Sequence, residues 1–209
     1  MIEINNITDI VLHLEGIKTV IFDMDDTLYG EKEYVRSGYR CVSKCVPSID
    51  KAEEKLWKFF TDGKNAIDEL LITEGVYTDD LKKICVKAYR YQVPDIHLYP
   101  GVKDMLISLK QQGYNIGIIT DGRVEGQEAK IKVLQLDKLV DKIIITDALG
   151  GTEFRKPSTK SYVLMSEYFN TNYSDMIYVG DNPKKDFIAC EKLGIRAVYF
   201  VNQNGLYSK

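Results

Sequence analysis

The stretch that decides the fold is "TVIFDMDDTLYG", residues 19–30, in which a short apolar run leads directly into three aspartates. The run over 19–23 has the apolar, β-branched character of a strand that is buried on both faces of a sheet. Carboxylates this close together repel one another, and one of them is normally driven to hold a proton. The sequence therefore calls for a compensating charge beside this cluster.

The bulk properties are those of a soluble globular chain. It has 209 residues, of which 44% are hydrophobic and 28% charged, and its net charge is -3. The length suits one α/β domain with an insertion, or one large and one small domain. The charge favours no nucleic-acid partner. No apolar run reaches the roughly 18 residues of a membrane span, and no signal peptide begins the chain, so we expect no membrane partner and a cytoplasmic location. The sequence leaves the oligomeric state open.

Five short apolar runs predict the strands of a parallel sheet. They are residues 19–23, 114–120, 142–146, 176–181 and 197–200. Helical segments are expected around the later strands, over residues 101–113, 126–136, 158–169 and 183–194. This alternation predicts a Rossmann-like, doubly wound α/β fold with five main strands.

One connection in this pattern is too long. A simple crossover between parallel strands needs only about 30 residues, whereas the segment between Asp23 and the strand ending at Thr120 is several times longer. Its excess is rich in helix formers, so we expect a helical cap domain over 31–95, inserted into a core domain of 1–30 and 96–209. Before the first strand, an apolar stripe predicts a short helix; its members are Ile7, Ile10, Val11 and Leu14.

Polar side chains gather where the predicted strands end. Ligands of an open parallel sheet bind beyond the carboxyl ends of its strands, so these side chains are expected to share one crevice. The set consists of Asp23, Asp25, Thr120, Asp121, Gly122, Lys156, Asp181 and Asp186.

This set resembles the four motifs of the haloacid dehalogenase-like hydrolase superfamily. "DMDDT" (23–27) matches its first motif, "IIT" (118–120) its second, the lysine of "RKP" (155–157) its third, and "GDNPKKD" (180–186) its fourth. All four occur in order, and the resemblance extends from about residue 17 over nearly the whole chain. An insertion between the first two motifs is similar to the helical-cap subfamily.

The resemblance implies that Asp23 is a nucleophile and Asp25 an acid/base. A carboxylate can attack phosphorus and form an aspartyl-phosphate, which divides a difficult hydrolysis into two steps. A second carboxyl two residues further on points to the same side of an extended segment. It can protonate the leaving alcohol and then activate water.

The remaining motif residues are expected to hold metal and phosphate. Mg²⁺ prefers oxygen ligands, often one or two carboxylates, and Asp23 and Asp181 would supply them, together with the backbone carbonyl of Asp25 that the family pattern implies. Asp186 is expected to orient a metal-bound water or Lys156. The phosphoryl group would be bound by Thr120 and Lys156, with help from the backbone amides of Asp121 and Gly122.

The sequence thus predicts a Mg²⁺-dependent phosphatase that acts on a small phosphorylated metabolite, of the sugar phosphate or nucleotide class. Three alternatives remain open, namely a phosphomutase, a 2-haloacid dehalogenase and a non-catalytic phosphate-binding regulatory module. In the cap, Arg36, Tyr39 and Arg40 are candidate substrate contacts, although the same pattern fits a helix with a solvated face.

Overall fold

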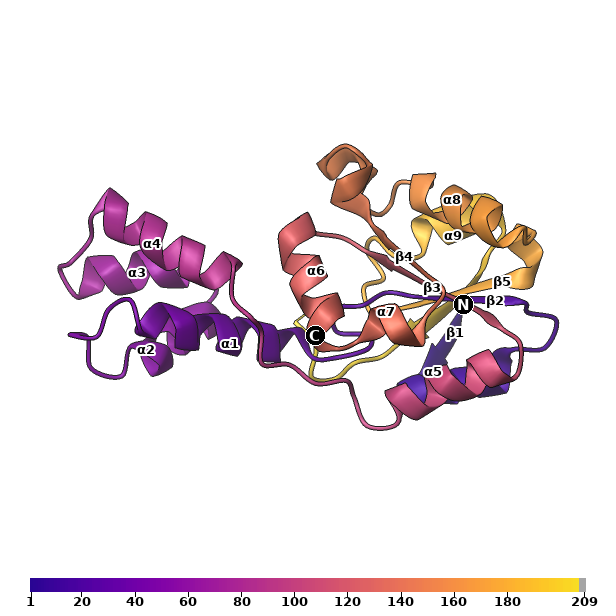
Figure 1. Ribbon diagram of the computed structural model, residues 1–209, viewed down its shortest axis with the longest axis horizontal. Helices are drawn as coiled ribbons and strands as arrows, with labels where there is room; N and C mark the ends of the chain where they lie inside the picture. Colours follow the sequence, from indigo (N-terminus) through magenta and orange to yellow (C-terminus); the bar gives the residue numbers. More distant parts are fainter. Residues whose placement is uncertain (207–209) are drawn as a thin grey trace. The chain divides into compact units, whose positions relative to one another are not determined.

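The computed structural model describes residues 1–206, and the chain forms two compact units (Figure 1). The first comprises Met1–Glu31 and the chain from His97 onward, and we call it the α/β unit. The second, Lys32–Ile96, contains only helices as regular elements and is called the helical unit. That the helical unit covers a substrate as a cap stays a prediction.

The α/β unit is built on one parallel sheet. Among residues 1–206 its strands are β1 (Ile2–Ile4), β2 (Thr19–Phe22), β3 (Asn115–Thr120), β4 (Lys142–Ile145), β5 (Met176–Gly180) and β6 (Arg196–Phe200). Their order in space is β1-β6-β5-β2-β3-β4, and every neighbouring pair is parallel. The chain leaves β2 towards β3 and β4 on one side and returns to β5 and β6 on the other. A ligand crevice is expected beside β2, at this switch point.

The doubly wound α/β fold is confirmed, but the expected number of five strands is wrong. The additional strand is β1, whose residues Ile2 and Ile4 pair with Val198 and Phe200 at the edge of the sheet. Three residues are too few to show a period of two. This strand exists because β6 offers it a free edge, which the local sequence does not reveal.

Strand β2 is the centre of the sheet and is completely buried. Val20, Ile21 and Phe22 are 0% exposed, and the buried Thr19 hydroxyl donates a hydrogen bond to Thr171 Oγ1 at 3.0 Å. Beyond the strand, the backbone N–H of Asp23 donates to the Val179 carbonyl at 2.8 Å. The first aspartate is therefore held by a ladder of hydrogen bonds rather than by a flexible loop.

Helices cover both faces of this sheet (Figure 1). They are α5 (Val102–Gln111), α6 (Val124–Val133), α7 (Leu136–Leu139), α8 (Lys160–Phe169) and α9 (Ile188–Leu193), with short 3₁₀ turns at Thr146–Leu149, Thr152–Phe154 and Tyr173–Asp175. Helices α8 and α9 lie on one face and α5 lies on the other. Tyr162 and Met165 of α8 pack against Ile21, Ile119 and Tyr178 of the strands.

Two expected helices differ from the observed ones. The segment 183–194 becomes helical only at Ile188, because Asp186 closes a tight loop instead: its carboxylate accepts the N–H of Asn182 at 2.9 Å, and its own N–H bonds the Asn182 carbonyl at 3.0 Å. Near the N-terminus, residues Ile7–His13 form a 3₁₀ helix. Its period of three buries Ile7 and Ile10 and leaves Val11 47% exposed.

The helical unit has a core of its own. Its helices are α1 (Glu31–Ser43, which begins in the α/β unit), α2 (Ala52–Thr61), α3 (Ala66–Thr73) and α4 (Asp79–Arg90). Leu56, Leu70 and Leu71 are fully buried in its centre, and the Thr78 side chain caps α4 by accepting the Leu81 N–H at 3.1 Å. Within residues 1–206, every helix is too short or too polar to cross a membrane.

Helices α1 and α4 approach closely at Gly38, which gives a test of the packing. Replacing glycine by alanine inside a helix normally stabilises it by about 1 kcal/mol. Here a Cβ atom would lie 2.4 Å from the Tyr89 ring, and overpacking costs about 1–3 kcal/mol. We expect Gly38→Ala to lower the free energy of unfolding in urea, with Lys87→Ala at an exposed position of α4 as control. A more stable Gly38→Ala protein would contradict this packing.

Candidate active site

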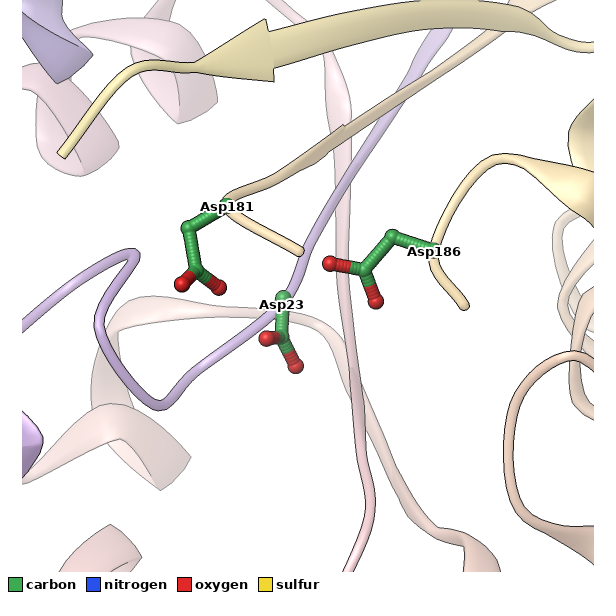
Figure 2. Close-up of side chains that lie close together, drawn as sticks. All are labelled: Asp23, Asp181 and Asp186. Atoms are coloured by element: carbon green, nitrogen blue, oxygen red, sulfur yellow. The ribbon is translucent and has the colours of Figure 1, made fainter. Parts of the chain in front are cut away.

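Three buried carboxylates converge at the carboxyl end of the sheet (Figure 2). Asp23 follows β2, Asp181 follows β5, and Asp186 lies in the loop before α9. One oxygen of each lies within 4.8 Å of the others, and the residues are 3%, 7% and 0% exposed. Segments far apart in the sequence thus place three acids around one point.

The ammonium group of Lys156 neutralises part of this charge. Its Nζ atom lies 2.6 Å from Asp23 Oδ1, 2.9 Å from Asp186 Oδ1 and 3.0 Å from the Tyr178 hydroxyl. Burial alone would lower the pKa of Lys156, but Asp186 and Asp23 outweigh it and raise that pKa well above its usual value. Lys156 therefore stays charged beside the two carboxylates.

Asp121 positions the backbone that carries Lys156. Its Oδ1 accepts hydrogen bonds from the Lys156 N–H at 3.0 Å and the Thr146 hydroxyl at 2.9 Å, and Lys185 Nζ lies 3.1 Å from its Oδ2. Burial opposes ionisation of Asp121, but Lys156 and Lys185 outweigh it and lower its pKa. Asp121 therefore connects the loop after β3 to the loop before α8.

The positive charge of Lys156 does not fully offset the negative charge of the three carboxylates. Burial raises the pKa of Asp23 to about 7 although Lys156 counteracts it. Burial, together with the charges of Asp23 and Asp186, raises the pKa of Asp181 to about 8. A further cation at this point would relieve the repulsion.

The carboxylate oxygens that are not engaged by other side chains indicate which residues could hold that cation. Both oxygens of Asp186 are engaged, because Oδ1 lies 2.9 Å from Lys156 Nζ and accepts the Tyr178 hydroxyl at 3.4 Å, and Oδ2 accepts the Asn182 N–H at 2.9 Å. Within residues 1–206, Oδ2 of Asp23 and Oδ2 of Asp181 have no hydrogen-bond partner, and Asp181 Oδ1 has only the Thr27 hydroxyl at 3.4 Å. Buried anionic oxygens fit a hard divalent cation such as Mg²⁺.

Gly180 is required by this arrangement. A Cβ atom at this position would lie 2.5 Å from Asp186 Oδ2 and 2.9 Å from its Cγ. Because these atoms belong to a buried, hydrogen-bonded carboxylate, they have no room to move away. The glycine of "GDNPKKD" therefore lets β5 and the loop before α9 approach each other.

Asp25 accepts hydrogen bonds from a different set of side chains. Its Oδ1 lies 2.7 Å from Lys130 Nζ and also accepts the Tyr29 hydroxyl, while its Oδ2 accepts Gln127 Nε2 at 2.8 Å. Burial raises the pKa of Asp25, but the charge of Lys130 and the hydrogen bonds outweigh it, so the net shift is downward. Part-buried Glu31 is close enough that burial and the charge of Asp25 raise its pKa to about 8.

Thr120 and Gly122 are tied to the same group through Gln127. Gln127 Nε2 donates to Thr120 Oγ1 at 2.5 Å as well as to Asp25. Gly122 has φ +139°, and a Cβ atom there would lie 3.2 Å from Gln127 Cδ. The loop after β3 therefore needs glycine to make room for this side chain.

Asp26 is built into the turn that leads to the helical unit. It has a left-handed backbone with φ 54°, and its carboxylate accepts the N–H groups of Glu31 at 2.8 Å and Leu206 at 2.7 Å. The aspartates of the opening stretch thus face three different environments.

The candidate substrate residues of the helical unit each have a partner inside that unit. Arg36 lies over the Trp57 ring, 4.0 Å from its centroid. Tyr39 is 6% exposed in the core, and burial raises its pKa to about 12. Arg40 forms an ion pair with Asp95 at 2.8 Å. Their contact with substrate stays a prediction.

Sequence reasoning missed Gln127, Lys130, Tyr178 and Lys185. The available signal was the spacing of Gln127 and Lys130, three residues apart in the helix that directly follows a site-bearing strand. That spacing puts both on one helix face. Polar residues at this spacing also fit a solvated surface, so the pattern by itself predicts no contact.

Comparison with known proteins relates the chain to one family. The sequence profile of the family "Haloacid dehalogenase-like hydrolase" matches residues 20–200. A glyceraldehyde 3-phosphate phosphatase of Methanocaldococcus jannaschii is 26% identical over 87% of this chain and 84% of that protein. Pyrophosphatase PpaX of Bacillus mycoides is 25% identical over 87% and 82%.

Two further matches differ in extent. A glyceraldehyde 3-phosphate phosphatase of Pyrococcus abyssi is 34% identical, but over only 48% of this chain and 41% of its own length. The crystal structure of a haloacid dehalogenase-superfamily hydrolase, subfamily IA, from Geobacter sulfurreducens is 20% identical with a TM-score of 0.66, covering 88% of this chain and 87% of that one. At this identity the likeness concerns the fold.

The raised pKa of Asp181 predicts a pH-dependent effect on stability. An acid whose pKa is higher in the folded state costs stability when ionised, and this cost disappears as pH falls through the folded pKa towards the unfolded value. Without divalent metal, Asp181→Asn should therefore be more stable than the wild type at about pH 9 in urea unfolding, with the difference shrinking towards about pH 5. Exposed Asp137→Asn is the control. A difference that grew on acidification would contradict the prediction.

Proposed function

We propose, because this chain belongs to the haloacid dehalogenase-like hydrolase family, that it is a Mg²⁺-dependent phosphatase acting on a small phosphomonoester through an aspartyl-phosphate. The observation that carries the proposal is the state of Asp23. Its Oδ1 is held by Lys156 at 2.6 Å, its backbone is fixed by β5, and its Oδ2 has no hydrogen-bond partner among residues 1–206. That oxygen is a positioned nucleophile.

In the first step Asp23 Oδ2 attacks the phosphorus atom of the substrate. A bond forms between this oxygen and phosphorus, the ester P–O bond breaks, and its electron pair leaves with the alcohol oxygen. Asp25 supplies the proton that the alcohol takes up. The acyl phosphate on Asp23 is the intermediate.

In the second step water attacks the phosphorus atom of the acyl phosphate. Asp25, now ionised, accepts a proton from this water, the bond between phosphorus and Asp23 breaks, and phosphate leaves. The Thr120 hydroxyl and the Lys156 ammonium group are donors for the phosphoryl oxygens in both steps.

The chain's own oxygens support a place for Mg²⁺. Asp181 and the second lone pair of Asp23 Oδ1 are the proposed side-chain ligands, which leaves Asp23 Oδ2 for the attack. The Asp25 carbonyl is the proposed backbone ligand, and Asp186 acts by holding Lys156 and the loop before α9. When bound, Mg²⁺ neutralises charge on the phosphoryl oxygens and on the carboxylates.

The names of the relatives support a small phosphorylated substrate. Two of the similar proteins are glyceraldehyde 3-phosphate phosphatases and one is a pyrophosphatase. We propose a phosphorylated sugar or related metabolite as substrate, with nucleotides as the second class. Pyrophosphate is the additional compound that a substrate panel should contain.

The alternatives predict different products. A phosphomutase would return the phosphoryl group to the sugar and release little phosphate. A 2-haloacid dehalogenase would share the aspartate nucleophile and release halide, and it has no need of a divalent cation. The set of Asp25, Asp181 and Asp186 argues against this alternative. A regulatory module would bind a phosphate mimic without turnover.

The proposal predicts metal-dependent release of phosphate from a phosphomonoester panel that includes triose phosphates, nucleotides and pyrophosphate. Chelation with EDTA should abolish activity and Mg²⁺ should restore it. Asp23→Asn should leave no measurable turnover, and Asp25→Asn should lose about 10²–10⁴-fold in kcat, the usual contribution of a general acid/base.

A matched control is Asp137→Asn, which makes the same change at an exposed position of α7. The proposal is wrong if phosphate release survives chelation or the Asp23→Asn substitution. Sugar phosphate isomers in place of free phosphate would favour the phosphomutase.

A further inference from the structure

We propose that Gln127 and Lys130 of α6 are positioning residues that orient the carboxyl group of Asp25 towards the leaving group. The inference rests on the proposed function, and it concerns residues outside the four sequence motifs of the family. Both side chains are buried, with Gln127 3% and Lys130 4% exposed. They lie three residues apart and reach the same carboxylate.

The hydrogen bonds to Asp25 are unequal. Oδ1 accepts two of them, from Lys130 Nζ at 2.7 Å and from the Tyr29 hydroxyl, whereas Oδ2 accepts only Gln127 Nε2 at 2.8 Å. Each carboxylate oxygen has two lone pairs. Oδ1 is therefore fully occupied, and the remaining lone pair of Oδ2 is the one that is left to face the leaving group.

Gln127 also places that oxygen relative to the phosphate-binding hydroxyl. Its amide nitrogen has two N–H groups, of which one goes to Asp25 Oδ2 and the other to Thr120 Oγ1 at 2.5 Å. Because Thr120 Oγ1 accepts this bond, its own hydrogen remains available for a phosphoryl oxygen. One side chain thus aligns the proton donor with a phosphate donor.

Lys130 contributes a fixed positive charge to this arrangement. A buried ammonium group is stable only when it is paired, and Lys130 of α6 pairs with Asp25, which follows β2. As the ester P–O bond breaks, the proton of the Asp25 carboxyl group moves to the leaving oxygen and the electron pair of the O–H bond stays on Asp25. The resulting carboxylate is held by Lys130, Gln127 and Tyr29.

The test compares two phosphomonoesters that differ in their need for a proton. An alkyl ester such as glycerol phosphate leaves as an alkoxide unless it is protonated, whereas para-nitrophenyl phosphate releases a stable anion. The quantity kcat/KM covers the steps up to release of the alcohol. We expect Lys130→Met to lower kcat/KM for the alkyl ester at least about tenfold more than for the aryl ester, a fraction of the usual effect of general acid catalysis.

Matched variants separate positioning from general damage. Lys132→Met removes the same charge from an exposed position of α6 and should leave both values near those of the wild type. Lys130→Arg keeps the cation and should recover part of the loss on the alkyl ester. If Lys130→Met does not fold, Gln127→Met gives the same comparison with the ion pair left in place.

A double-mutant cycle tests the dependence on Asp25. If Lys130 acts through this carboxylate, Lys130→Met should lower kcat/KM for the alkyl ester in the wild type but cause no further loss in an Asp25→Ala background. Equal losses on both esters, no loss on either, or additive losses in the cycle would overturn the inference. A wild type that hydrolyses neither ester, nor any member of the panel, would overturn the proposed function itself.

Discussion

The contact between Lys156 and the carboxylates of Asp23 and Asp186 is the interaction on which the site depends. It joins the end of β2, the loop before α8 and the loop before α9 through side chains that are almost completely buried. Removing one partner of a buried ion pair typically costs about 3–5 kcal/mol, because the other charge is left uncompensated. The buried triad therefore holds three distant segments in one geometry.

The three aspartates of residues 23–26 acquire different properties from this framework. Asp23 ends a fully buried strand and meets Lys156, Asp25 turns towards Lys130 and Gln127, and Asp26 adopts a left-handed backbone and binds N–H groups. The charge of the opening stretch is thus divided between two lysines, backbone amides and the proposed cation. Burial raises the pKa of Asp23 to about 7 while Lys130 outweighs burial and lowers the pKa of Asp25. Neighbouring identical residues can therefore take separate roles.

The sequence predicted the parts of the fold that short-range patterns control. Strand β2 follows from a continuous apolar run, and residues such as Asp181 and Lys156 could be assigned to one crevice because parallel strands end at the same edge. Strand β1 and the late start of α9 could not be predicted, since they depend on a free edge at β6 and on the hydrogen bonds of Asp186. Gln127 and Lys130 were missed for the same reason, because their role arises from contact with Asp25.

The central claim is that Asp23 is the nucleophile, and mapping a trapped phosphoryl group tests it most directly. The enzyme is mixed with Mg²⁺ and a turned-over phosphomonoester, quenched in acid, digested and analysed by mass spectrometry, with borohydride reduction to mark acyl phosphates. The account predicts a phosphoryl group on Asp23 of the wild type and none in Asp23→Asn. In Asp25→Asn the amount of trapped phosphoryl group should rise if the substitution slows hydrolysis of the aspartyl-phosphate more than its formation. A phosphoryl group on another residue, or labelling that persists in Asp23→Asn, would contradict it.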